Sequence, residues 1–205
     1  MKNKEIRNYT VEELRVDGEG DSPKRIRGYA AVFGKLSDDL GYFREKIAPG
    51  AFSDTIKTAD IRALWNHDPN FVLGRNKSGT LTLEENQKGL IIDVEPPDTQ
   101  WARDLMVSIK RGDIDQMSFG FRTIADEWDY TDEKNPIRTL VKVDLFDVSP
   151  VTYPAYPQTS VSVRSIKEVY DAQLAQIKAK EQEAADNAAR KNALRIIQLN
   201  EIGRK

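Results

Sequence analysis

The last fifth of the chain differs sharply in texture from the rest. From Ser165 onward it contains no proline, and no glycine before Gly203, and Ala, Glu, Gln, Lys and Leu dominate. This composition favours a helix, and apolar residues recur there at helical spacing: Ile166, Tyr170, Leu174 and Ile177. The sequence therefore predicts two parts, a folded domain over 1–163 and a helical tail over 164–205.

The first part has the texture of a strand-rich domain, because Gly, Pro, Asn and Asp repeatedly interrupt stretches of β-branched and aromatic residues. Strands are expected in 25–36, 60–68, 113–130 and 138–154, with a hairpin over 79–96 that turns between Glu84 and Gly89. Helical segments are expected at 49–59 and 98–112; the second has Thr99 or Asp98 as its N-cap and Gly112 as its C-cap. We predict a mainly β fold with helices, of the α+β class.

Composition removes several kinds of chemistry and partner. The chain has no cysteine, which excludes disulfides, thiolate zinc sites, iron–sulfur clusters and cysteine nucleophiles. Its net charge of −2 gives no electrostatic reason to expect nucleic acid or an anionic membrane as a partner. No apolar run reaches the roughly 18–20 residues that a membrane helix needs, and the N-terminal residues do not form a signal peptide. We expect an intracellular protein.

The chain has a single histidine, His67. One imidazole cannot build a histidine-rich metal site, and any hydrolase mechanism with a histidine base must use this residue. Alternation over 60–68 puts His67 at the end of a strand, on the same face as Ile61, Ala63 and Trp65.

Two further residues complete a candidate constellation. Ser118 shares a small, polar strand face with Gly120, while large apolar residues occupy the opposite face: Met117, Phe119 and Phe121. Asp147 ends the alternating face of Thr139 to Leu145, where another apolar residue would continue the pattern. A Ser–His–acid site needs a hydroxyl, an imidazole that takes its proton and a group that orients the imidazole. These three residue types on three strands make such a site a hypothesis.

Other interpretations stay open at this point. His67 is also compatible with a surface or core position, Ser118 with close packing and Asp147 with a strand-end cap. A Ser–Lys dyad would use Lys142, which alternation puts on the face opposite Asp147. A metal-dependent hydrolase would use the acidic pairs Asp113/Asp115 or Asp144/Asp147.

Several motifs together resemble the prohead maturation proteases of tailed bacteriophages. They are GYAAVFGKLSDDLGYFREKIAPGAF, the NHD around His67, MSFGF around Ser118 and LFDVSPVTYPAY around Asp147. The resemblance covers roughly residues 7–163, in the family's order. It implies that Ser118 is the nucleophile, His67 the base and Asp147 the third member, where the family often has the longer Glu.

The resemblance also implies a fold and a biological role. The fold would be similar to the herpesvirus assembly proteases, a compact, mostly antiparallel β-barrel flanked by helices. Those enzymes use a second histidine as third member, which this chain lacks. The implied activity is that of a serine endopeptidase that cleaves scaffold and capsid precursor segments, and itself, inside the assembling prohead in the host cytoplasm.

Partners and remaining site residues follow from this role. The partners would be the major capsid protein precursor and its scaffolding segment, with 164–205 as a removable docking element and self-association left open. No cofactor or metal is required. Gly120 and Arg122, just beyond the nucleophile, are candidates for stabilising the oxyanion. The alternative from another class is a non-enzymatic capsid assembly or scaffolding protein.

Overall fold

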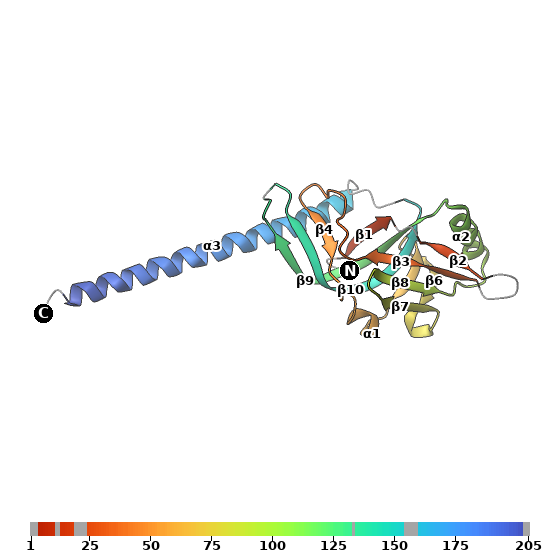
Figure 1. Ribbon diagram of the computed structural model, residues 1–205, viewed down its shortest axis with the longest axis horizontal. Coiled ribbons are helices and arrows are strands. Elements are labelled where there is room, and N and C mark those ends of the chain that lie inside the picture. Colours follow the sequence, from red (N-terminus) through yellow and green to blue (C-terminus); the bar gives the residue numbers. More distant parts are fainter. Residues whose placement is uncertain (1–3, 11–12, 19–23, 133, 154–159, 203–205) are drawn as a thin grey trace. The chain divides into compact units, whose positions relative to one another are not determined.

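The computed structural model describes residues 4–10, 13–18, 24–132, 134–153 and 160–202 (Figure 1). The strands are β1 (Glu5–Thr10), β2 (Arg15–Asp17), β3 (Arg25–Val32), β4 (Arg44–Ile47), β5 (Arg62–Trp65), β6 (Asp68–Arg75), β7 (Leu81–Glu85), β8 (Gly89–Val94), β9 (Gln116–Asp129) and β10 (Ile137–Val151). The α-helices are α1 (Thr55–Thr58), α2 (Gln100–Arg111) and α3 (Ser160–Ile202), and a 3-10 turn covers Asn76–Ser78. Within these residues the fold is mixed α+β and mostly strands, as predicted.

The strands form two sheets. The larger has the order β1-β9-β10-β5-β6, with β4 also paired to β10, and the smaller has the order β2-β3-β8-β7. Pairing is antiparallel except where β10 meets β4 and β5. The described strands thus pair as two sheets, and their hydrogen bonds do not close a single barrel.

One buried cluster of apolar side chains joins both sheets and the helix α2. From β9 it receives Phe119 and Phe121, whose rings are 4.9 Å apart, and Phe52 packs edge-on against Phe119 at 5.4 Å. Alternation along β9 therefore turns Met117, Phe119 and Phe121 into the core, as the sequence predicted. Ser118 and Gly120 consequently belong to the opposite face of the same strand.

Local signals in the sequence are confirmed elsewhere in the domain. The hairpin over 79–96 forms from β7 and β8. Helix α2 ends at Gly112, whose positive φ of 79° is the left-handed C-cap conformation that glycine adopts most easily. The helix expected over 49–59 is a single turn, α1.

The chain divides into two compact units, Met1–Ser165 and Ile166–Lys205. The second unit consists of most of helix α3, and its side chains over 178–191 are all exposed. No helix among the described residues is both long and apolar enough to cross a bilayer.

Candidate active site

His67 lies in the two-residue turn between β5 and β6, where Trp65 pairs with Asp68. Asn66 and His67 both have positive φ, 53° and 58°, as a type I′ hairpin turn requires. The prediction that His67 continues the strand is wrong, because β5 ends at Trp65 and the chain reverses at Asn66.

Asn66 fixes this turn to the end of β10. Its backbone N–H donates to the Pro150 carbonyl at 3.0 Å. Its side-chain oxygen accepts from the Thr152 N–H at 2.9 Å, and its side-chain nitrogen donates to the Thr152 hydroxyl at 3.2 Å. The imidazole of the next residue is thereby held beside the strand that carries Asp147.

A β-bulge in β10 decides where Asp147 points. Leu145 lies opposite Phe121 on the core side, whereas Asp147 lies opposite Gly120, and the register shifts between them. Since adjacent residues of β9 face opposite sides, this shift turns Asp147 onto the Ser118 side of the sheet. The prediction that Asp147 continues the Leu145 face is therefore wrong.

The structure brings His67, Ser118 and Asp147 together. The His67 Nε2 atom lies 2.6 Å from the Ser118 Oγ, and the His67 Nδ1 atom is hydrogen-bonded to the Asp147 Oδ2. The Ser118 residue is 0% exposed and Asp147 3%, while the His67 side chain is 13% exposed. An imidazole between a hydroxyl and a carboxylate is the arrangement that activates a nucleophile in acyl transfer.

Two polar residues that were not predicted from the sequence also contact this cluster. The Ser149 hydroxyl donates to the Asp147 Oδ2 at 3.2 Å and lies 3.3 Å from the His67 Nδ1. The Lys4 ammonium donates to the Asp147 Oδ1 at 2.6 Å. Ser149 follows Asp147 by two residues and pairs with Ser118, so strand alternation was a usable signal for it. Lys4 carried no comparable signal.

Asp147 is ionised in this setting. Burial alone would raise the pKa of its carboxyl, but the hydrogen bond and charge of His67, followed by those of Lys4, outweigh burial and hold the pKa below its ordinary value. The carboxylate is thus available to orient the imidazole and to stabilise its protonated form.

The oxyanion candidates lie further along β9. Gly120 sits between β1 and β10, opposite Ile6 and Asp147, and a Cβ there would lie 2.5 Å from the Asp147 Oδ1. Glycine is therefore required for close approach of the carboxylate. Arg122 is four residues from Ser118, about 13 Å along the strand. Glycine has no side chain to offer an oxyanion, and the Arg122 guanidinium is bound to Asp144.

The groups of the alternative mechanisms have other partners. The Lys142 ammonium binds Asp54 at 2.6 Å. Asp113 pairs with Arg111 at 2.9 Å, and Asp144 pairs with Arg122. Over the ranges that the structure describes, no three His, Asp or Glu side chains are grouped as metal ligands would be.

Comparison with known proteins adds three findings. Residues 9–172 match a protein family described as caudovirus prohead serine protease. The chain is 25% identical over 177 residues to the prohead protease of Enterobacteria phage HK97, covering 82% of this chain and 74% of that protein. Among solved structures, the capsid assembly protease of bacteriophage T4 is similar with a TM-score of 0.47 and 10% identity, over 73% of this chain and 97% of that one.

Proposed function

This chain belongs to the caudovirus prohead serine protease family, and from that membership we propose that Ser118 is its nucleophile, His67 its base and Asp147 the third member of a catalytic triad. The observation that carries the proposal is the position of His67, with Nε2 at 2.6 Å from the Ser118 Oγ and Nδ1 bonded to the Asp147 carboxylate.

The proposed reaction is peptide-bond hydrolysis through an acyl-enzyme. The Ser118 Oγ attacks the peptide carbonyl carbon while its proton passes to the His67 Nε2. His67 then gives that proton to the leaving amine, and a water repeats the two transfers to release the acid. Asp147 holds the imidazole with Nδ1 protonated and balances its positive charge.

The proposed substrates are scaffold and capsid precursor segments, and the chain itself, inside the assembling prohead in the host cytoplasm. The family's description and the name of the HK97 relative support a role in the prohead. We propose further that the helical tail docks on the capsid precursor or its scaffolding segment, and that the domain is related to the barrel of the herpesvirus assembly proteases.

The test is the mass of the chain over time, alone and with the capsid precursor. Ser118→Ala and His67→Ala should each lower cleavage by about 10⁶-fold, and the double variant should be scarcely worse, because triad members act as a unit. Ser108→Ala is the matched control, since this hydroxyl on α2 only donates within its own helix.

Two outcomes would contradict the proposal. Normal processing by Ser118→Ala would exclude this nucleophile, whereas a wild-type chain that cleaves neither itself nor the capsid precursor would favour a non-enzymatic assembly protein. A harmless His67→Ala would instead favour a lysine base. Arg122→Gln, scored in the same assay, tests whether Arg122 leaves Asp144 to stabilise the oxyanion.

A further inference from the structure

The strand β1 pairs with one edge of β9, along the segment that contains Ser118. It pairs antiparallel with β9, with Asn8 directly opposite Ser118, while β10 occupies the other edge of β9. Proteins that bind extended peptides commonly pair them with a free strand edge in this way. Here that edge beside the proposed nucleophile is already filled by the chain's own N-terminal strand.

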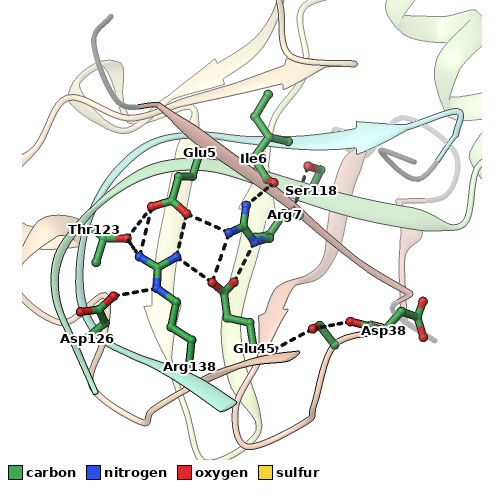
Figure 2. Close-up of polar contacts among 10 residues, drawn as sticks. Glu5, Ile6, Arg7, Asp38, Glu45, Ser118, Thr123, Asp126 and Arg138 are labelled. Atoms are coloured by element: carbon green, nitrogen blue, oxygen red, sulfur yellow. Dashed lines mark hydrogen bonds and ion pairs between the residues drawn. The ribbon is translucent and has the colours of Figure 1, made fainter. Parts of the chain in front are cut away.

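The main chain of β1 also engages the reactive hydroxyl. The Ser118 Oγ donates a hydrogen bond to the Arg7 carbonyl oxygen at 3.0 Å (Figure 2). A serine hydroxyl has one proton, so while this bond exists the proton is not directed at the His67 Nε2. The Arg7 carbonyl thus competes with the proposed base for the same proton.

The orientation of this carbonyl makes β1 a poor substrate at this bond. Nucleophilic attack requires Oγ to approach the carbonyl carbon, with the oxygen pointing to donors elsewhere. In the observed contact the oxygen itself points at Oγ. Together with the complete burial of Ser118, this describes a strand that covers the nucleophile without being cut there.

A buried set of charges holds β1 in place (Figure 2). We call it the charge clamp, and its members are Glu5, Arg7, Glu45 and Arg138. Arg7 donates to Glu45 and Glu5 at 2.8 Å, and Arg138 donates to Glu5 at 2.8 Å and to Glu45 at 2.9 Å. Their side chains are 0–7% exposed. The clamp connects β1 to β4 and β10. On the opposite face of the sheet, Lys4 forms an ion pair with Asp147.

We propose that the edge of β9 that pairs with β1 is the peptide-binding site of this protease, and that β1 occupies this site in the structure. An extended substrate segment must then displace β1 before the substrate can be cleaved. This inference rests on the function proposed above. Release of β1 removes the Arg7 carbonyl from Ser118, so that the Ser118 hydroxyl can donate its hydrogen bond to His67. It also exposes the β9 edge to an incoming strand.

A reversible crosslink tests the proposal in the full-length chain. Because the protein has no cysteine, the double variant Thr10→Cys/Gln116→Cys introduces a single cross-strand pair between β1 and β9. We measure the rate at which a small fluorophosphonate labels Ser118, before and after reduction of the disulfide. The oxidised form should label about 10-fold more slowly or worse than the reduced form, and reduction should restore the wild-type rate. The single variant Thr10→Cys controls for the oxidant.

A second variant provides an independent readout should the disulfide not form. Arg7→Gln weakens the charge clamp and should accelerate both labelling and hydrogen exchange of the β1 amides by about 10-fold. Arg15→Gln is the control, because its ion pair with Asp17 is half-exposed and lies in β2. Equal labelling of the oxidised and reduced double variants, or faster β1 exchange without faster labelling, would overturn the inference. If neither the wild type nor Arg7→Gln labels at Ser118 although β1 exchanges faster in the variant, the proposed function itself is rejected.

Discussion

At the scale of single residues, Asp147 and Ser149 separate the electrostatic part of the proposed triad from the orienting part. We expect Asp147→Asn to lower kcat by about 10⁴-fold, because an amide neither fixes the Nδ1 tautomer nor balances the imidazolium. Ser149→Ala should cost less, about 10- to 150-fold, since it removes one hydrogen bond to the ionised Asp147 carboxylate, worth about 1.5–3 kcal/mol. Steady-state cleavage of the capsid precursor gives both values. Equal losses would contradict this division of roles.

His67 was proposed as the base because of its residue type, but its position in the fold was predicted wrongly from the alternation pattern. As the chain's only histidine it was the unavoidable base candidate. Alternation from Ile61 to His67 predicts an uninterrupted strand and misses the chain reversal, because Asn66-His67 lacks the glycine that usually marks a type I′ turn. Two consecutive left-handed residues without glycine are uncommon, and the three hydrogen bonds between Asn66 and the pair Pro150 and Thr152 support them. Those partners are more than 80 residues away, so no local signal reveals them.

At the scale of elements, β1 should make stability depend on pH through Glu5. Burial would raise the pKa of Glu5, but Arg7 and Arg138 outweigh burial and lower it to about 2 from 4.5. A carboxyl with a depressed folded pKa stabilises the protein above its unfolded pKa and loses that contribution as the pH falls toward the folded value. The stabilisation from Glu5 should therefore be complete above pH 4.5 and disappear toward pH 2.

Glu5→Gln measures this contribution. At pH 7 it should lower the free energy of unfolding by about 3 kcal/mol, the equivalent of the shift in pKa. The difference from wild type should narrow steadily as the pH is lowered from 4.5, in urea unfolding monitored by tryptophan fluorescence. Glu84→Gln on the exposed side of β7 is the control and should show no such trend. A difference that stays constant with pH would show that Glu5 acts by packing and not by charge.

The strands that carry the site residues were easier to predict than the side of the sheet on which each side chain lies. The small polar face of β9 correctly separated Ser118 from the buried Phe119 and Phe121. The same rule failed for β10, because a bulge between Leu145 and Asp147 inserts one residue and reverses the faces. The sequence there has no glycine or proline to mark it. A bulge of this kind is stabilised by its cross-strand partners, which a single strand's pattern does not contain.

At the scale of the whole molecule, composition predicts a strand-rich domain and a helical tail, but it does not predict the order of strands in the sheets. β1 and β9 are neighbours although more than 100 residues separate them, and the charge clamp joins Glu5 to Arg138. Such buried ion pairs look like ordinary surface charges in the sequence, because each member alone is typical of an exposed position. The covering of Ser118 by β1 was for that reason not foreseen.

The tail carries the last prediction. Helix α3 continues through a stretch, 178–191, whose side chains are all exposed, and a helix of that kind gains little from packing within its own chain. If it is the docking element of the protease, the partner should cover its apolar positions. Leu174→Glu/Ile177→Glu in the full-length chain should therefore abolish incorporation into proheads assembled with the capsid precursor, while fluorophosphonate labelling of Ser118 stays within about 2-fold.

The control for the tail adds the same charge elsewhere on the helix. Gln176→Glu/Gln182→Glu changes two exposed positions and should leave incorporation intact, because neither belongs to the apolar stripe. Sedimentation of assembled proheads, followed by mass spectrometry of their contents, reports the amount of protease inside. Equal incorporation of both double variants would show that the apolar positions of the tail are not needed for docking. If Leu174→Glu/Ile177→Glu loses both labelling and incorporation, these positions act on the catalytic domain. A docking surface would change only where the enzyme is located and not how Ser118 reacts.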